Sequence, residues 1–320
     1  MEIQDIQKQL DRCGSLKPLD LIIDDLAWRY LCRAVIRGKN ILFVGPSRSG
    51  KTKAAQSVAK AFDRQDKFFY FNLGSTQDAR AALIGNTMFK KESGTVFHPS
   101  QFVKAIQTPG AIILLDELSR GHHDAWNILM TVLDPTQRYL RLDEAEDSAI
   151  VPVAEGVTCI ATANIGNEYT ATRVMDKALT LRFPVIVEMK TLTDVQELNL
   201  LMTIHPNIEN SDAEKFKVLT KISYDTKKQC KMEESRITNF IPTGTVVEMA
   251  ELVLDGFTLN EIVEMVIYPL YSDDGGVESE RTYAKAIVQK YLDLKAAAVS
   301  SPINDPANIG GQKNRRIQFT

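Results

Sequence analysis

The segment GPSRSGKT, residues 45–52, restricts the possible folds of this chain more than any other feature. It follows a short apolar run, residues 40–44, which is typical of a buried parallel strand. It leads into the alanine-rich segment 51–62, which contains no helix breaker and is expected to form a helix. A strand, a glycine-containing loop and a helix in this order are the context in which the pattern G-x-x-x-x-G-K-[ST] binds phosphate.

Each part of this loop has a chemical role in phosphate binding. Gly45 and Gly50 allow backbone N–H groups to turn toward phosphate oxygens, and the dipole of the following helix favours negative charge there. Lys51 would reach the β- and γ-phosphates of a nucleotide, and Thr52 would hold Mg²⁺. The other loop residues expected to bind the nucleotide are Pro46, Ser47, Arg48 and Ser49. A glycine-rich turn that binds nothing is the alternative.

A second apolar run, residues 111–115, ends in the acidic pair Asp116 and Glu117. Two charges at the end of a buried strand are costly unless they meet a cation or water. Asp116 fits a role at the Mg²⁺ ion beside the phosphate loop. Glu117 would point toward an attacking water, which it can orient and partly deprotonate. The pair therefore favours hydrolysis over transfer to a second substrate.

A third run, residues 157–163, ends at Asn164. Its side-chain amide can position the same water, although an asparagine that only turns the chain is the alternative. The sequence contains no Asn-Lys-x-Asp motif that would read guanine. We therefore expect ATP as the nucleotide, together with Mg²⁺.

Composition bears on partners and compartment. The formal net charge is −3, so no global positive field attracts nucleic acid, although a local basic patch is compatible with it. The 4 cysteines lack metal-ligand spacing and are typical of reduced thiols. The first residues lack an export core, and the apolar runs are far shorter than the ~20 residues of a membrane helix. A cytoplasmic protein without a membrane span is expected.

Two further segments allow more than one interpretation. The aromatic run 68–71, FFYF, can stack on nucleic-acid bases or form a buried strand, and the strand is favoured. The acidic stretch 143–147 is expected to be the solvated tip of a hairpin between Arg138 and Val157, with a pore-facing loop as the alternative.

The motifs GPSRSGKT, ILLDE and ATAN, in this order and spacing, resemble those of AAA+ ATPases over roughly residues 20–295. The segment 78–106 is similar to the helix-2 insert of the MoxR branch, in which Leu-Ile-Gly leads to a hairpin and a helix. Residues 166–183 resemble CobS- and CbbQ-like members. This resemblance implies an α/β fold: a P-loop domain with a parallel five-stranded sheet and a helix-2 insert, then a small all-α lid.

The domain boundaries follow from the same resemblance. We predict a large nucleotide-binding domain at 1–189, a helical lid at 190–298 and a flexible tail at 299–320. The lid of such proteins usually offers an arginine to the nucleotide, but the matching position here is Gly244. Slow turnover, completion of the site by a partner, or substitution by Arg236 are the alternatives.

The resemblance also implies a catalytic arginine that acts across a subunit boundary. Arg182, in the pair Arg182-Phe183, matches the residue that enters the neighbouring nucleotide site, and Arg173 is a second candidate. A guanidinium that neutralises charge developing on the γ-phosphate is worth about 10³–10⁵ in rate. A surface ion pair is the alternative for either residue. Leu181 stands where family members have aspartate.

These observations together predict a ring-forming ATPase. The resemblance implies a homo-oligomer, expected to be hexameric, that remodels a protein or helps to insert a metal. It also implies a partner with a von Willebrand A domain. A nucleic-acid-associated motor and a nucleotide-gated assembly switch are the alternatives, and the net charge of −3 argues against the motor.

Overall fold

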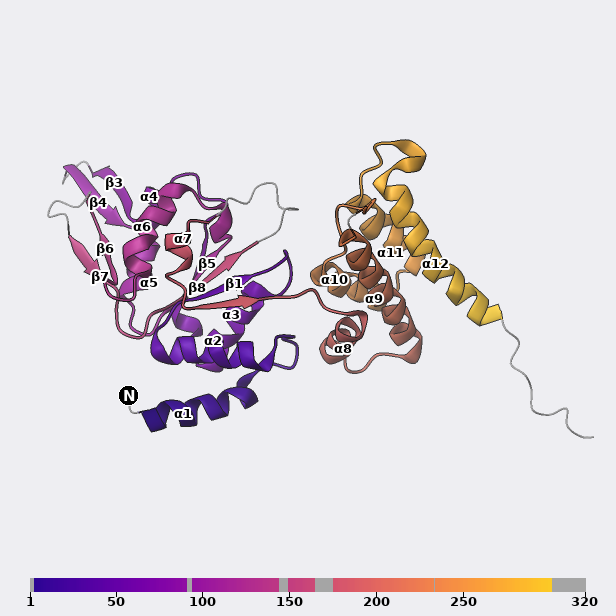
Figure 1. The fold of residues 1–320 in the computed structure, drawn as a ribbon, viewed down its shortest axis with the longest axis horizontal. Coiled ribbons are helices and arrows are strands. Elements are labelled where there is room, and N and C mark those ends of the chain that lie inside the picture. The colour runs from indigo at the N-terminus through magenta and orange to yellow at the C-terminus, as the bar shows by residue number, and fades with distance from the viewer. Residues whose placement is uncertain (1–2, 91–93, 144–148, 165–174, 233, 301–320) are drawn as a thin grey trace, which may run out of the picture.

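The computed structural model describes residues 3–90, 94–143, 149–164, 175–232 and 234–300. One part of the chain is built around a parallel sheet, and a second part consists of helices that follow the last strand of that sheet (Figure 1). Residues 301–320 of the expected tail lie outside the described residues. The domain limits at 189 and 298 stay a prediction.

The central sheet has 5 strands in the order β2-β5-β8-β1-β9. All its neighbouring strands run parallel; Ile41, for example, pairs with Ile160 on one side and with Val185 on the other. The predicted parallel five-stranded sheet is therefore confirmed. The strands are β1 (Ile41–Val44), β2 (Phe68–Asn72), β5 (Ile112–Asp116), β8 (Thr158–Ala163) and β9 (Val185–Glu188).

Helices cover both faces of the sheet (Figure 1). Successive side chains of a strand point to opposite faces, so Ile41 and Phe43 join one buried cluster while Leu42 and Val44 join the other. The first face carries α1 (Ile3–Arg12), α2 (Asp25–Arg37) and α3 (Lys51–Ala61). The second face carries α4 (Ala79–Leu83), α5 (Gln101–Gln107), α6 (His123–Leu133) and α7 (Lys177–Thr180).

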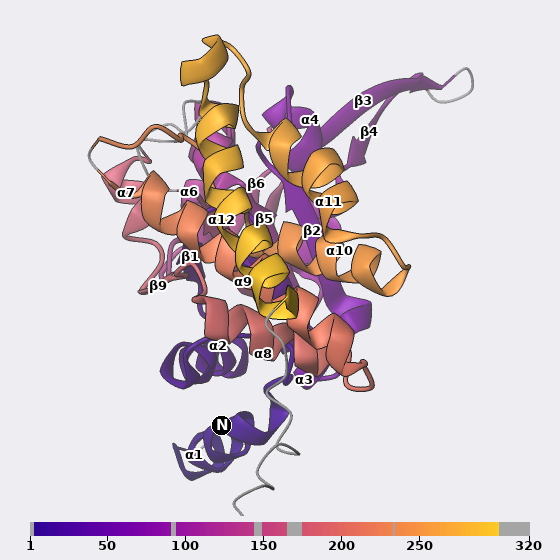
Figure 2. The same cartoon turned by 90° about the vertical axis from the view of Figure 1, so that its right-hand side faces the viewer.

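Two antiparallel hairpins extend the large part. Strands β3 (Gly85–Lys90) and β4 (Gly94–Pro99) form the first, which projects from the body in Figure 2 and confirms the hairpin expected in the helix-2 insert. Strands β6 (Tyr139–Arg141) and β7 (Ile150–Pro152) form the second. The acidic tip predicted at 143–147 lies almost wholly outside the described residues.

The lid is all-helical, as predicted. Thr193 and Thr258 form capping boxes with Gln196 and Glu261, which fix where α8 and α11 begin. Its helices are α8 (Asp194–Ile204), α9 (Asn210–Cys230), α10 (Thr243–Leu254), α11 (Leu259–Ile262) and α12 (Glu280–Ser300). They enclose their own buried cluster, separate from the two clusters of the sheet.

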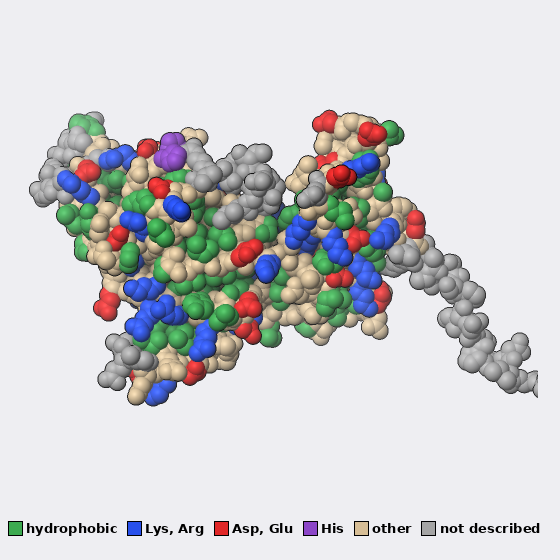
Figure 3. All heavy atoms as spheres, in the orientation of Figure 1, with side chains coloured by type: hydrophobic (Ala, Val, Ile, Leu, Met, Phe, Trp, Pro, Cys, Tyr) green, Lys and Arg blue, Asp and Glu red, His purple; other side chains and the backbone are tan. Residues whose placement is uncertain are grey.

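The surface seen in Figure 3 carries acidic and basic side chains interspersed with one another, in line with the small net charge of −3. Within the described part of the chain, no helix is long and apolar enough to cross a membrane.

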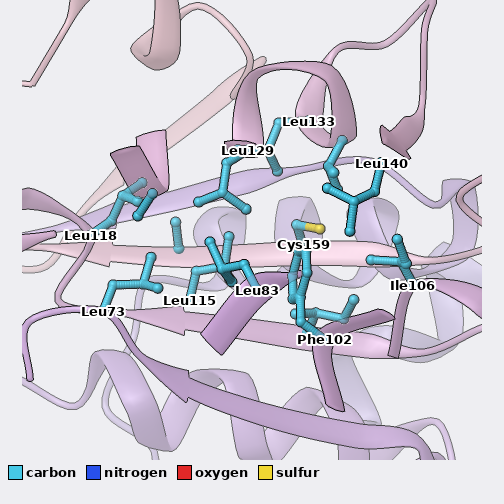
Figure 4. Close-up of a cluster of buried hydrophobic side chains, with 14 of the residues drawn as sticks. Leu73, Leu83, Phe102, Ile106, Leu115, Leu118, Leu129, Leu133, Leu140 and Cys159 are labelled. Atoms are coloured by element: carbon cyan, nitrogen blue, oxygen red, sulfur yellow. The ribbon is translucent and has the colours of Figure 1, made fainter. Parts of the chain in front are cut away.

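The core beneath the second face of the sheet holds the strands that end at the site described below. Figure 4 shows Phe102 of α5 and Leu129 of α6 near Leu115 and Cys159 of the sheet, all of them fully buried. Burying one such leucine or phenylalanine contributes about 1.5–3 kcal/mol. The carboxyl ends of β5 and β8 are therefore set on a rigid base.

The junction between sheet and lid is packed closely against the start of the phosphate loop. The backbone N–H of Met189 donates to the carbonyl of Val44 at 2.7 Å. Gly45 has a φ of 146°, and a Cβ at this position would lie 2.3 Å from the carbonyl oxygen of Met189. A glycine is therefore required where β1 enters the loop.

Candidate active site

The carboxyl ends of the parallel strands, called the carboxyl edge below, bring together residues that are far apart in the sequence. Lys51 begins α3, and its Nζ donates to the side-chain oxygen of Asn164 at 2.9 Å. The same Nζ donates to the carbonyl oxygens of Gly45 at 2.9 Å and Pro46 at 2.6 Å. Two residues predicted to share a nucleotide site, Lys51 and Asn164, are thus in direct contact.

The ammonium group of Lys51 is buried, with the side chain only 8% exposed. Loss of hydration lowers the pKa of Lys51 to about 8, and the negative charges of Asp116 and Glu117 oppose that shift only in part. The site therefore holds a cation whose charge its own carboxylates do not fully stabilise, as expected of a group that binds an anionic ligand.

Asp116 is surrounded by hydroxyl groups. Its Oδ2 accepts from Thr52 Oγ1 at 3.4 Å and from the Tyr70 hydroxyl at 3.0 Å, while its Oδ1 accepts from the hydroxyl of Thr162. Carboxylate and hydroxyl oxygens are the ligands Mg²⁺ prefers in nucleotide sites. Thr52 and Asp116 thus lie where the sequence expects a Mg²⁺ site, whereas Tyr70 and Thr162 were not predicted.

Glu117 has an unusual backbone and two constraints on its side chain. Its φ is 55°, and its N–H donates to Thr162 Oγ1 at 3.0 Å. One carboxylate oxygen accepts from Arg120 Nη1 at 3.3 Å. A Cβ on Gly74 would lie 2.3 Å from the other oxygen, so Gly74 leaves the room that this carboxylate occupies. A strained residue at the end of a strand is typical of a functional site.

The loop itself fits a phosphate group. Gly50, directly before α3, has a φ of 91°, a left-handed conformation that glycine adopts without strain. The hydroxyl oxygen of Ser49 is buried and has no hydrogen-bond partner among the described residues. An orphaned polar atom beside a buried lysine is what a phosphate oxygen would satisfy. The residues present therefore fit a nucleoside triphosphate with Mg²⁺.

A cavity of about 320 Å³ lies beside the loop. It is bordered by the loop, by the segment Asp20–Ile22 ahead of α2, by residues 190–192 after β9, and by lid residues that include Leu200 and Gly244. The sequence predicted the loop side but not the Asp20–Ile22 wall, because a short segment without a motif gives no signal of where it packs. A cavity with an apolar wall next to a phosphate loop suits a nucleoside.

Two lid residues, Gly244 and Arg236, bear on the expected lid arginine. Gly244 lies against the loop, where a Cβ would be 3.4 Å from Cδ of Arg48. Arg236 lies elsewhere: its guanidinium stacks 4.5 Å from the ring centre of Tyr283 and borders a different hollow. Arg236 is therefore not a substitute for a lid arginine at this cavity.

Arg182 lies just before β9 begins. It is therefore at the amino ends of the strands, called the amino edge below, opposite the carboxyl edge. Its Nη2 is 3.2 Å from Oδ2 of Asp134, and its Nη1 donates to the carbonyl of Ala178 at 3.0 Å. Its Nε is buried without a hydrogen-bond partner in the part of the chain that the structure describes. Arg182 and Lys51 thus lie at opposite ends of the strands. Arg173 lies outside the described residues.

Positive charge gathers around Arg182. A hollow of about 220 Å³ is lined by four basic residues together with Asn40 and small or apolar neighbours. Asn40 bridges two of these residues, since its Nδ2 donates to the carbonyl of Arg182 at 3.1 Å and its Oδ1 accepts from Arg138 at 3.3 Å. The four basic residues are Arg33, Lys39, Arg138 and Arg182.

Comparison with known proteins agrees with this geometry. Residues 40–183 match the family model described as "AAA domain (dynein-related subfamily)". A Dictyostelium discoideum protein named mitochondrial Lon protease homolog 1 is 31% identical over 170 residues, which is 51% of this chain and 17% of that protein. A Thauera aromatica protein named "Putative chaperone BssE" is 33% identical over 146 residues, which is 45% of this chain and 48% of that protein.

These matches cover half or less of either relative, and they fall on about half of this chain. Among solved structures, a closed-state reconstruction of Hsp104 with ATPγS and FITC casein superposes with a TM-score of 0.50 and 17% identity. That superposition covers 70% of this chain and 45% of the Hsp104 chain. The large part of the chain therefore has the AAA+ P-loop fold.

Proposed function

We propose that this protein is an ATPase that hydrolyses ATP to ADP and phosphate and works as a ring. The observation that carries the proposal is the division of the catalytic groups between the two edges of one sheet. Lys51, Asp116 and Asn164 meet at the carboxyl edge, whereas Arg182 lies at the amino edge. An arginine at the amino ends of the strands does not reach the nucleotide site of its own subunit, but it can reach the site of an adjacent subunit.

Each group at the carboxyl edge has a role in the proposed reaction. Lys51 and the loop N–H groups bind the β- and γ-phosphates, and Thr52 with Asp116 would hold Mg²⁺, which supplies charge neutralisation on the phosphates when bound. Glu117 orients the attacking water and takes its proton. Asn164 Oδ1, which Lys51 holds in place, aligns that water.

The ring and its partner form the second half of the proposal. Arg182 of one subunit binds the γ-phosphate in the next, and a hexamer is the expected closed arrangement. We propose a protein as the substrate that the ring remodels, in the manner of the MoxR branch. The chaperone name of the Thauera relative and the casein in the Hsp104 complex support a protein substrate. The proposal also includes a partner protein with a von Willebrand A domain and a role of the ring in metal insertion.

Mixing two inactive variants tests the shared site. Arg182→Ala should bind ATP nearly normally and hydrolyse it at well below a tenth of the wild-type rate. Glu117→Gln should also bind without turnover, because its water is not activated. At a mixed interface, the Arg182→Ala subunit supplies an intact Glu117 and its neighbour supplies an intact Arg182. The steady-state ATPase rate of the mixture should therefore partly recover.

The control is each variant mixed with itself at the same total concentration, under conditions where subunit exchange is demonstrated by fluorescence transfer. Two variants that stay inactive after exchange would contradict a site shared between subunits. Full activity of Arg182→Ala alone would place the trans-acting arginine elsewhere and make Arg173 the next candidate. Pull-down with Glu117→Gln, which retains ATP, tests the protein partner.

A further inference from the structure

Two unfavourable residue choices meet at one point of the nucleotide cavity. Arg48 has a φ of 57°, a left-handed conformation that residues with a Cβ adopt rarely. Gly244 lies in the first turn of α10, and glycine within a helix is less favourable than alanine. The backbone of Gly244 is not among those with a positive φ, so its conformation does not require glycine.

The absent side chain at Gly244 leaves room for Arg48. A Cβ built on Gly244 would lie 3.4 Å from Cδ, 3.6 Å from Cβ and 3.8 Å from Cγ of Arg48. A methyl group would just fit, but any longer side chain would occupy the volume that the Arg48 side chain fills. The glycine at position 244 thus leaves the space that the Arg48 side chain fills.

Arg48 joins the phosphate loop to the lid. Its Nη1 donates to Oγ1 of Thr245 at 2.9 Å, and Thr245 is itself buried. Of the three other cations that line the cavity, two have carboxylate partners: Lys53 pairs with Asp20, and Lys227 pairs with Glu197. Among the described residues, the guanidinium of Arg48 contacts a neutral hydroxyl and no carboxylate.

We propose that Arg48 is the residue that couples occupancy of the phosphate site to the position of the lid. A phosphate oxygen carries charge and is a stronger acceptor for a guanidinium than the hydroxyl of Thr245. A nucleoside triphosphate in the loop therefore draws Arg48 away from Thr245 and releases the start of α10. This inference rests on the proposed function, because it takes a nucleoside triphosphate as the ligand.

The competition makes two neighbouring substitutions act in opposite directions. Arg48→Ala removes a charged hydrogen bond to the nucleotide and should weaken ATP affinity about 10-fold in isothermal calorimetry. Thr245→Val removes the competing acceptor at nearly constant shape and should tighten it about 3-fold. Thr203→Val, on the exposed side of α8, is the matched control and should leave affinity unchanged.

A second pair of variants tests the fit between Arg48 and Gly244. Gly244→Leu should weaken ATP affinity in the wild type because it displaces the Arg48 side chain. The same substitution should have a much smaller effect in the Arg48→Ala background, since the volume is then empty. Hydrogen exchange at the first turn of α10 should rise when ATP binds to the wild type, and this change should be absent in Arg48→Ala. Thermal unfolding midpoints show that each variant is folded.

The outcomes separate this inference from the proposed function. If the wild type binds no nucleotide, or Lys51→Ala binds it as well as the wild type, the proposed function fails. If those controls behave as expected but Thr245→Val weakens ATP binding, the contact between Arg48 and Thr245 persists when ATP is bound, and the proposed coupling is wrong. Unchanged affinity in Arg48→Ala, or additive effects of Arg48→Ala and Gly244→Leu, would equally overturn it. Arg48→Lys, which keeps the charge but not the planar fork, should give intermediate affinity.

Discussion

The two edges of the central sheet have opposite characters. At the carboxyl edge, the cation Lys51 lies within the field of Asp116 and Glu117, and hydroxyl groups saturate the carboxylate of Asp116. At the amino edge, four basic residues line one hollow, and the Arg182 guanidinium has Asp134 as its acidic partner. One edge has both signs of charge, whereas the other has an excess of positive charge.

This difference shows what each edge requires from outside. The carboxyl edge combines a buried lysine with carboxylate and hydroxyl groups, a set that suits an anionic ligand bound together with a cation. The amino edge contains donors without a matching acceptor, including the buried Nε of Arg182 among the described residues. An anion bound in the hollow would offset this excess of positive charge.

The largest effect is expected from Lys51→Ala, which tests whether the carboxyl edge binds the nucleotide. The β- and γ-phosphates would lose the cation that the loop supplies, so ATP affinity should fall by at least about 100-fold in calorimetry. Lys60→Ala, a lysine on the exposed side of the same helix, should bind ATP normally. Equal binding by Lys51→Ala and the wild type would remove Lys51 from the site.

The next effect is on rate and tests the amino edge. Arg182→Lys keeps the positive charge but loses the planar fork, so it should bind ATP normally and hydrolyse it about 10-fold more slowly. Arg33→Lys, in the same basic hollow, is the matched control and should retain most of the rate. A larger loss in Arg33→Lys than in Arg182→Lys would mean that the catalytic arginine of this edge is misassigned.

ATP affinity is expected to fall about tenfold per pH unit at alkaline pH, because of Lys51 at the carboxyl edge. The pKa of Lys51 is about 8, so the group is charged below this pH and neutral above it in the protein without nucleotide. Phosphate binds the charged form and raises this pKa, so ATP affinity should be constant below about pH 8 and fall as pH rises further. In Lys51→Arg, whose guanidinium stays protonated, calorimetry between about pH 7 and 9.5 should show no such fall. A parallel fall in both proteins would assign the titration to another group.

A smaller effect is expected from Tyr70→Phe, which removes one donor to Asp116. The tyrosine is 48% exposed and its hydrogen bond is 3.0 Å long, so the loss is worth about a factor of 3 in the Mg²⁺ concentration that half-saturates the ATPase. Tyr30→Phe, on the exposed part of α2, is the control. A Tyr70→Phe enzyme with wild-type Mg²⁺ dependence would show that Tyr70 does not position Asp116.

No effect is expected from nucleic acid. The basic hollow at the amino edge is small, and charges of both signs are interspersed over the face in Figure 3. DNA and RNA of mixed sequence should therefore leave the ATPase rate unchanged at physiological salt. A several-fold stimulation would favour the nucleic-acid motor over the protein-remodelling ring.

Much of the carboxyl edge could be predicted because three strands end in the residues that meet there. Parallel strands place their carboxyl ends together, so the order of Lys51, Asp116 and Asn164 after apolar runs predicts their proximity. The contacts of Tyr70 and Thr162 with Asp116 could not be predicted, since they depend on which strands are neighbours. The aromatic run that contains Tyr70 forms a strand, as expected. This strand, β2, is an outermost strand of the sheet and is only partly buried.

The lid was predictable as helices but not in its contacts. Capping boxes at Thr193 and Thr258 mark helix starts from local sequence alone. The meeting of Arg48 with Thr245 joins residues 197 positions apart, and no local pattern encodes it. The sequence therefore pointed to Gly244 as a lost arginine, whereas the structure shows an arginine of the loop in the adjacent space.

The close contact between Gly45 and Met189 has a mechanical consequence. Because a Cβ on Gly45 would lie only 2.3 Å from the Met189 carbonyl oxygen, the first residue of the loop and the first residues leading to the lid share no slack. A change of backbone conformation at Gly45 therefore has to be accommodated at Met189, whose N–H is also bonded to the carbonyl of Val44.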